Sequence, residues 1–333
     1  MKKLNLIPAL IALTLMFGCK KNSNTVKPAA TASTNSLIAD SVTVYAGSYV
    51  ANPNIVNPPA TNGPLSSALF GGPMGMTMDA SGNLYVADYY SDDIRKITPA
   101  GMVSTISTGI DMPSYIAMDA SGNLYVTFAQ IDKVMPNGSL HMLNHAAFIG
   151  LTADNNGNIF ASTPTQIMKL DQSSGTMVPY AGTTTAGSAD GAVSAASFTN
   201  IESLAADSKG NLFVMDGNSI RTINIAKGQV QTLALKGSPQ FANPQGIAVD
   251  QWDNIYVVNY GNNADGFILK IAADGTVSNF AGNAQRPANA AGLSGQPQSV
   301  SFEGPQGIFI LPSGNILVAS YDNVIQQIVT HKQ

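Results

Sequence analysis

A short motif that recurs along the chain constrains its fold more than any other feature. The octapeptide Asp-Ala-Ser-Gly-Asn-Leu-Tyr-Val occurs twice without a change, at 79–86 and at 119–126. Alignment on its Asn reveals six copies, each with a turn-forming cluster before a short apolar run: Asn83, Asn123, Asn158, Asn211, Asn254 and Asn315. The mean spacing between copies is about 46 residues, and a period of this length indicates a repeat architecture.

Each repeat contains four short apolar runs. In the first unit these are GMTMD, NLYVAD, IRKIT and MVSTIS, and the D-x-x-G-N cluster between the first two supplies Gly and Asn for a tight hairpin. Surface helices are disfavoured, because only 11% of the residues are charged and the chain has just two glutamates. The sequence therefore predicts an all-β fold, a six-bladed β-propeller of four-stranded blades.

The two ends of the chain are predicted to pair with each other. The second run of every unit has a bulky residue at one position, which suits strands buried between blades: Tyr85, Tyr125, Phe160, Phe213, Tyr256 and Leu317. The sixth unit stops after its third run at 323–329, whereas an unassigned strand at 42–47 precedes the first unit. We expect this N-terminal strand to complete the sixth blade and so remove the open edge of the ring.

The first residues have the character of a targeting segment. Two lysines precede an uncharged apolar run at 4–18, which is short for a membrane span, and the sole cysteine of the chain, Cys19, follows directly. This pattern resembles a bacterial lipobox and predicts a lipoprotein signal peptide at 1–18 with lipidation of Cys19; an ordinary signal peptide is the alternative. Polar, small and Pro-interrupted residues predict a flexible tether at 19–41, followed by the propeller at 42–333.

This arrangement predicts a lipid-anchored protein of the bacterial cell envelope. No Asp that would favour inner-membrane retention follows Cys19, so the outer membrane is expected, in a periplasmic orientation. No second cysteine is present for an intramolecular disulfide, so packing must hold the exported domain together. The formal charge of -4 offers no basic surface for nucleic acid; we expect a monomer that contacts the membrane only through its lipid.

Several elements resemble the NHL repeat. They are G-I-A-V-D, G-N-L-Y-V-A-D, I-R-K-I and the F-x-x-P-x-G segments at 70–75 and 302–307, and the resemblance covers about 42–330. It implies a propeller with Asp–Arg pairs between second and third strands, which two units retain: Asp88 with Arg95 and Asp216 with Arg221. The fifth and sixth units depart from this pairing, with Asn259 and Lys270 and with Ser320 and Gln327.

Chain direction sorts the connections between strands into two faces. The longest connections, at 48–72, 183–199 and 283–303, fall on the same face as the loops from each second to each third strand. Four tyrosines occupy those loops, where their rings could stack against a sugar or a peptide: Tyr89, Tyr90, Tyr260 and Tyr321. Tyr is also common at strand ends, so a structural role for each ring is the alternative.

A polar rim is expected at the mouth of the central channel. One aligned position at the start of each first strand carries Met74, Ser114, Ile149, Glu202, Gln245 and Gln306. Glu303 lies three residues before the last of these. This rim could bind sugar hydroxyls, or hold a Ca²⁺ ion with Glu202 as a ligand. Alternatively, Glu202 and Glu303 are solvated loop carboxylates, and the Gln amides bridge neighbouring strands.

Signals for catalysis are weak. The histidines His141, His145 and His331 are too scattered for a zinc site, and no G-x-S-x-G or P-loop motif occurs. We therefore expect no catalytic residue and no obligatory cofactor, and we expect a binding or scaffold module for a glycan, a peptide or an envelope protein. The alternative is a metal-dependent hydrolase or lactonase that resembles the gluconolactonase-like propellers.

Overall fold

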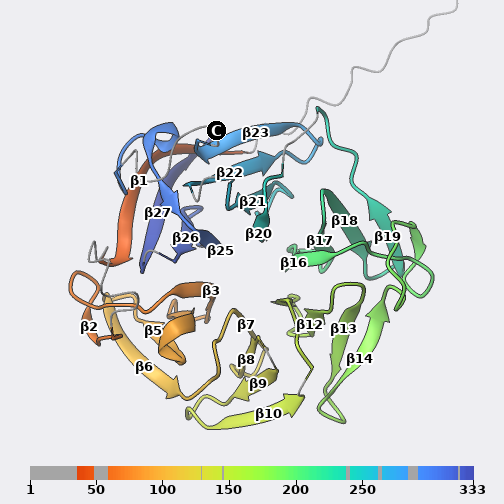
Figure 1. Cartoon of the computed structure of the whole chain (residues 1–333), viewed down its shortest axis with the longest axis horizontal. Coiled ribbons are helices and arrows are strands. Elements are labelled where there is room, and N and C mark those ends of the chain that lie inside the picture. Colours follow the sequence, from red (N-terminus) through yellow and green to blue (C-terminus); the bar gives the residue numbers. More distant parts are fainter. Residues whose placement is uncertain are drawn as a thin grey trace, which may run out of the picture. The chain divides into compact units, whose positions relative to one another are not determined.

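The structure is a computed structural model that describes residues 36–48, 59–128, 130–144, 146–237, 241–261, 265–283, 292–321 and 323–333. Within these residues, six antiparallel sheets surround a common axis like the blades of a propeller (Figure 1). The predicted all-β, six-bladed fold is therefore confirmed. The expected signal peptide at 1–18, the lipidation site Cys19 and the tether up to residue 35 lie outside the described residues.

Each blade has its first strand nearest the axis and its fourth at the periphery (Figure 1). The first three blades are built from β3 (Pro73–Met78), β4 (Leu84–Asp88), β5 (Asp93–Ile97), β6 (Met102–Thr108), β7 (Tyr115–Met118), β8 (Leu124–Thr127), β9 (Ile131–Val134), β10 (Leu140–Asn144), β11 (Gly150–Ala153), β12 (Ile159–Ser162), β13 (Ile167–Asp171) and β14 (Thr176–Ala181). The short helix η1 (Tyr89–Ser91) links β4 to β5.

The other three blades follow the same plan. They are built from β16 (Ile201–Ala206), β17 (Leu212–Asp216), β18 (Ser219–Asn224), β19 (Gln229–Thr232), β20 (Pro244–Val249), β21 (Ile255–Asn259), β22 (Asp265–Ile271), β23 (Val277–Gly282), β25 (Pro305–Ile310), β26 (Ile316–Ser320), β27 (Val324–Lys332) and β1 (Leu37–Gly47). No helix in the described part of the chain is long and apolar enough to cross a membrane.

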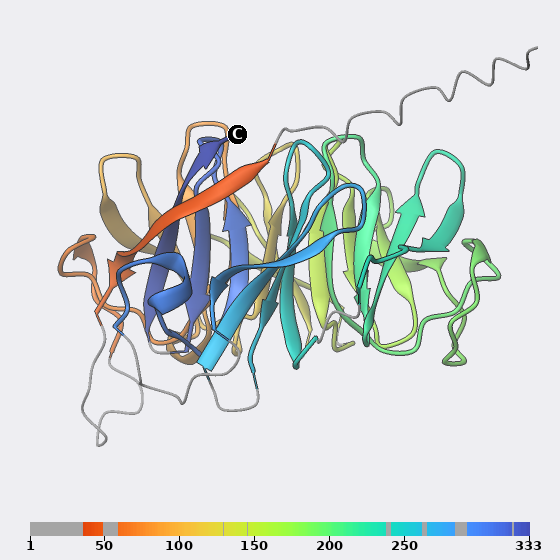
Figure 2. The same cartoon turned by 90° about the horizontal axis from the view of Figure 1, so that it is seen from above.

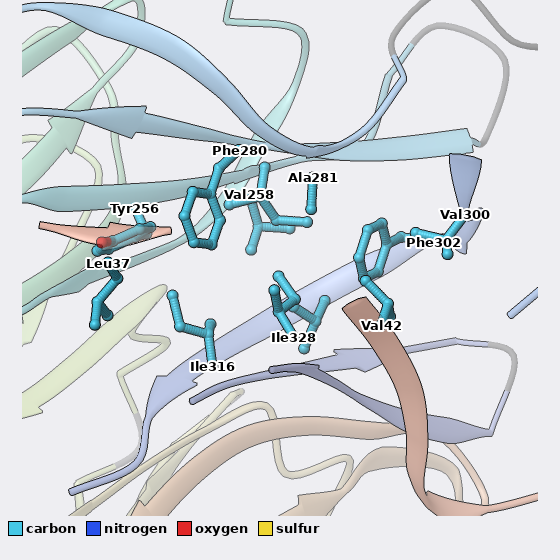
Figure 3. Packing of buried hydrophobic residues seen from close by; sticks show 12 residues of the cluster. Leu37, Val42, Tyr256, Val258, Phe280, Ala281, Val300, Phe302, Ile316 and Ile328 are labelled. Atoms are coloured by element: carbon cyan, nitrogen blue, oxygen red, sulfur yellow. The ribbon is translucent and has the colours of Figure 1, made fainter. Parts of the chain in front are cut away.

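The sixth blade joins the two ends of the described chain. β1 runs antiparallel to β27 along the outside of this blade, so the expected closure of the ring is confirmed (Figure 2). The strand begins at Leu37 rather than at Val42, because Leu37 is buried in an apolar cluster between the fifth and sixth blades (Figure 3). Neighbours of Leu37 in this cluster include Tyr256, Ile316 and Ile328.

Apolar clusters between neighbouring blades hold the ring together. The described residues form six such clusters, and each draws its side chains from two adjacent blades. Aromatic residues of the second strands enter them, and Tyr125, Phe160 and Tyr256 are at most 1% exposed. The bulky position of the repeat is thus an interface position. Burial on both sides explains why these strands are almost continuously apolar in sequence.

One face of the ring carries the tight turns between first and second strands, and we call it the turn face. In the first blade, one carboxylate oxygen of Asp79 accepts the main-chain N–H groups of Ser81 and Asn83, and the other accepts the Asn83 amide. Gly82 closes this turn with φ of 80°, in the left-handed region that favours glycine. The same three bonds recur in four more blades, around Asp119, Asp154, Asp207 and Asp250.

The long connections lie mainly on the outer edges of the blades. They add β2 (Gly63–Pro64) to the first blade and β15 (Gly191–Ala192) to the fourth, and they form η2 (Pro297–Ser299) and β24 (Phe302–Glu303) beside the fifth. A buried side chain on the third strand of the adjoining blade donates to carbonyl groups of each connection; these side chains are Arg95, Arg221 and Gln326. The connections therefore cover strand edges that would otherwise be open to other chains.

The two expected Asp–Arg pairs are present. Arg95 contacts Asp88 at 3.1 Å and Arg221 contacts Asp216 at 2.9 Å, with all four side chains at most 2% exposed. Each pair lies at the end of a second strand. Because each arginine also binds its long connection, the pair fixes that connection to the blade.

The residues expected to take the place of the arginine in the fifth and sixth blades, Lys270 and Gln327, are wrong by one position. In the first and fourth blades, the arginine lies opposite a valine of the second strand. The residue opposite the equivalent valine is Leu269 in the fifth blade, not Lys270. In the sixth blade it is Gln326, not Gln327. A shift of one residue turns a side chain to the other face of a strand. Lys270 accordingly lies over the ring of Tyr256, 6.0 Å from its centroid.

Candidate functional site

The face opposite the turn face contains the mouth of the central channel, and we call it the mouth face. The residue directly after the second strand is aromatic in four consecutive blades, the fifth, sixth, first and second; these residues are Tyr260, Tyr321, Tyr89 and Phe128. The third and fourth blades have Thr163 and Gly217 there. Together with Tyr90, the four aromatic residues form what we call the aromatic arc.

Ring contacts join four of the five members of the arc. The Tyr89 ring lies edge-to-face with the rings of Tyr90 and Phe128, at centroid distances of 4.8 and 5.6 Å. The Tyr321 ring lies 6.4 Å from Tyr89 and 6.0 Å from Tyr90. Even so, Tyr90 is 46% exposed and Phe128 is 38% exposed. The arc therefore offers aromatic surface to the solvent at the mouth, where a ligand can stack on it.

Tyr321 lies at the centre of the arc. Burial raises the pKa of Tyr321 to about 12, and the neighbouring hydroxyls of Tyr90, Tyr89 and Tyr260 add to the effect. Gly304 fits between Tyr321 and Tyr260, because a Cβ atom on Gly304 would lie 3.2 Å from one ring and 3.3 Å from the other. A glycine at this position therefore lets two tyrosines from different blades approach each other.

A channel about 270 Å³ in volume runs between the first strands of the six blades. Most residues that line it are apolar or small, and Gly75, Ala117 and Ala205 are among them. At the mouth it is lined by polar as well as apolar groups, and Ser114 and Gln306 contribute to it. A pocket of this kind, apolar with a few polar groups, is typical of a ligand site.

Tyr115 bridges the channel between the second and fourth blades. Its hydroxyl donates a hydrogen bond of 3.2 Å to the main-chain carbonyl of Glu202. Burial, with smaller contributions from the charges of Glu202 and Tyr321, raises the pKa of Tyr115 to about 12. The Tyr115 hydroxyl therefore stays protonated at neutral pH and can donate its bond to the Glu202 main chain.

Glu202 has an incompletely satisfied carboxylate at the start of β16. Its Oε1 accepts a bond of 3.2 Å from the Asn200 amide, whereas Oε2 is buried and has no hydrogen-bond partner. Burial raises the pKa of Glu202, the Asn200 bond lowers it, and the negative charge of Asp216 raises it. An unpaired buried carboxylate oxygen is costly, so a donor that reached it would be strongly favoured.

The other predicted rim residues hold the connections in place. The side-chain amide of Gln245 donates to the carbonyl of Asn243, and that of Gln306 donates to the carbonyl of Gly304. Both bonds reach back two residues along the chain, so the expectation that these amides bridge neighbouring strands is wrong. Glu303 belongs to β24 and pairs through its backbone with β22 of the fifth blade.

Sequence reasoning missed two residues of this site. Phe128 occupies the same repeat position as Tyr89, Tyr260 and Tyr321, so a comparison of the six units at that position would have found it. Tyr115 gives no comparable signal, because its role depends on its side chain reaching across the ring to Glu202. The four predicted tyrosines lie together on the mouth face, and Glu202 is linked to Tyr115 through its main chain.

No group of three or more His, Cys, Asp or Glu side chains able to hold a metal ion is present among the described residues. His141 lies exposed on the outer strand β10, and His331 contacts Asp40 at 2.7 Å at the end of β27. His145 lies outside the described residues. The expected role of Glu202 as a Ca²⁺ ligand stays a prediction.

Known structures share this fold at low sequence identity. An auxiliary nutrient binding protein from Bacteroides ovatus matches with a TM-score of 0.67 at 15% identity, over 88% of this chain and 77% of its own. A protein of the same description from Bacteroides thetaiotaomicron matches with a TM-score of 0.65 at 16% identity, over 89% and 77%. A gluconolactonase from Xanthomonas campestris matches with a TM-score of 0.56 at 11% identity, over 90% and 97%.

Sequence comparison identifies the family. No curated protein matches the chain significantly. The model of the teneurin NHL domain, in contrast, matches residues 51–333, which include the first five blades and three of the four strands of the sixth. Together with the NHL-like elements of the repeat, this match shows that the chain belongs to the teneurin NHL domain family.

Proposed function

We propose that this chain is a ligand-binding module of the bacterial cell envelope, held at the outer membrane by a lipid on Cys19. Its ligand, a glycan or a peptide, lies at the mouth of the channel and stacks on the aromatic arc. The binding of a partner protein would use the same surface through a side chain or an attached sugar. Catalysis is not part of this proposal.

The observation that carries the proposal is the placement of the arc. Five aromatic side chains gather on four consecutive blades of the mouth face, although the repeat itself requires none at these positions, as Thr163 and Gly217 show. Rings that are not needed for packing and are partly exposed favour a binding role. The fold also occurs in two proteins described as auxiliary nutrient binding proteins, which supports a binding role.

The hydrolase alternative has weaker support. The likeness to a gluconolactonase concerns the fold alone, because the two chains share 11% identity. A metal-dependent reaction also needs a set of ligands, and no group of three or more His, Cys, Asp or Glu side chains that could supply one is present among the described residues. We therefore favour binding over hydrolysis.

A binding screen with a matched variant tests the proposal. The full chain is applied to glycan and peptide arrays beside a variant in which Tyr89, Tyr90 and Tyr260 are changed to Ala. We expect the parent to retain a defined class of probe and the variant to lose it, because the ring surface is gone. Thermal melts must show that both proteins are folded. Equal retention by a folded variant would refute the arc as the binding surface.

A further inference from the structure

Charged side chains are distributed unequally between the two faces. Among the described residues, the connections that form the mouth face contain one lysine, Lys236, and this is paired with Asp274 on the hairpin of a neighbouring blade. The two arginines nearest the mouth, Arg95 and Arg221, are buried and paired with carboxylates. The same connections carry several acids, among them Asp92, Asp111, Glu202 and Glu303.

Lysines on the third strands lie over aromatic rings inside the blades instead of at the mouth. Lys96, Lys133 and Lys169 are each 5.6 Å from the centroid of a ring on the adjacent second strand, close to the turn face. The described residues of the mouth face therefore carry more negative than positive charge. Such a surface attracts cations and repels anions.

Glu202 gives this negative surface a specific contact point. Its Oε1 has one neutral donor, its Oε2 has none, and Tyr115 contacts its main chain instead of its carboxylate. The last torsion of a Glu side chain rotates easily, so either oxygen can turn toward a group that enters the mouth. A charged donor would form the strongest bond here, because hydrogen bonds between two ions are about twice as strong as neutral ones.

The arc provides the second half of a cation site. Ring faces attract an ammonium group through their quadrupole, and the effect increases when the group is partly removed from water. Glu202 lies at the mouth end of β16 in the fourth blade, and Tyr260 of the arc directly follows β21 in the adjacent fifth blade, so one ligand can reach the carboxylate and the rings together. Neither feature would help an anion.

We propose that the ligand of the mouth carries a protonated amine, which binds the Glu202 carboxylate while the body of the ligand stacks on the arc. This inference rests on the proposed binding function and names the chemical class that the site selects. An amine of this kind occurs in de-acetylated amino sugars and in lysine side chains. Acetylation would remove the charge and two of the three donors, and would leave a bulkier, neutral amide.

Two matched pairs of probes test the proposal by calorimetry with the full chain. The first pair is a glucosamine pentamer and its fully N-acetylated form. The second is a lysine tripeptide blocked at both ends and its Nε-acetylated form. We expect the amine member of at least one pair to bind roughly tenfold more tightly than its acetylated partner. The pair that shows the difference identifies the source of the amine.

Variants separate the carboxylate from general electrostatics. We expect Glu202→Gln to remove the preference for the amine, and Asn200→Ala, which keeps the carboxylate, to retain it. Asp111→Asn deletes the same charge from an exposed position on the mouth face and should change binding by less than about twofold. A melt of each variant confirms that it is folded.

Three outcomes would overturn the amine proposal: equal binding of acetylated and free probes, an unchanged preference in Glu202→Gln, or no binding by any of the four probes. The proposed function is judged separately on the arrays. If acetylated or neutral probes bind and the tyrosine variant loses them, the arc remains the binding surface and the ammonium contact is wrong.

Discussion

The turn face and the mouth face differ in how fully their carboxylates are hydrogen-bonded. On the turn face, both oxygens of Asp250 accept hydrogen bonds, from Trp252, Asn254 and Tyr256, and a similar network recurs in four other blades. On the mouth face, Glu202 has one oxygen with a single weak bond and another with none. Carboxylates that recur in the repeat and have all their hydrogen bonds stabilise the fold. The Glu202 carboxylate, which does not recur and lacks a hydrogen bond, is available to a ligand.

The largest effect predicted from this comparison concerns the turn face. Asp250→Ala should lower the free energy of unfolding by about 3 kcal/mol, because it leaves several buried donors without an acceptor. Urea unfolding followed by circular dichroism measures the loss. The sixth blade has Leu311 in place of the turn aspartate, so Ser313→Ala in that turn serves as the control and should change little. A loss below about 1 kcal/mol in Asp250→Ala would contradict the assigned role.

The mouth face should show the reverse pattern, in which binding changes and stability does not. Tyr90→Ala should weaken ligand binding by about 1 kcal/mol, or roughly fivefold, because an exposed ring is lost from the arc. Its free energy of unfolding should stay within about 0.5 kcal/mol of the parent. Met102→Ala removes a similarly exposed side chain, 48% accessible, from the outer strand β6 and should leave binding unchanged. A folded Tyr90→Ala protein with full affinity would remove Tyr90 from the site.

A smaller effect is expected in the pH dependence of stability, through the carboxyl group of Glu202. Burial raises the pKa of Glu202 above its ordinary value of 4.5, so the folded state holds this proton more tightly than the unfolded state. The Glu202 contribution to stability should therefore decline as the pH rises from 4.5 to the raised pKa, and should be constant above it. The difference in melting temperature between the parent and Glu202→Gln, followed with pH, measures this contribution. A parent that gained stability relative to the variant across that range would contradict the predicted sign.

The smallest expected effect is that of Ca²⁺. Because no group of three or more His, Cys, Asp or Glu side chains surrounds Glu202 among the described residues, a Ca²⁺ ion held by Glu202 should bind weakly, and added Ca²⁺ or a chelator should move the melting temperature little. A cation that bound the folded state at a hundredfold excess over its Kd would add about 2.7 kcal/mol of stability, which a melt detects easily. A shift that disappears in Glu202→Gln would restore the metal site and make lactone assays the next step.

Much of the fold and part of the site could be predicted from the sequence. The six units, the closing strand and the four tyrosines follow from periodicity and chain direction, because hairpins fix which face each loop occupies. The register of the third strands in the fifth and sixth blades could not be predicted, since residue type favoured Lys270 and Gln327 while pairing selected their neighbours. The unpaired oxygen of Glu202 depends on packing across the channel, which no local pattern records.

The direction of β1 determines where anything attached to the N-terminus would lie. β1 begins at Leu37, beside Gly314 in a tight turn of the turn face, and ends at Gly47 on the mouth face. The described chain therefore begins on the side of the ring away from the aromatic arc, so its first residues leave the mouth open to molecules that diffuse in from the surrounding solution.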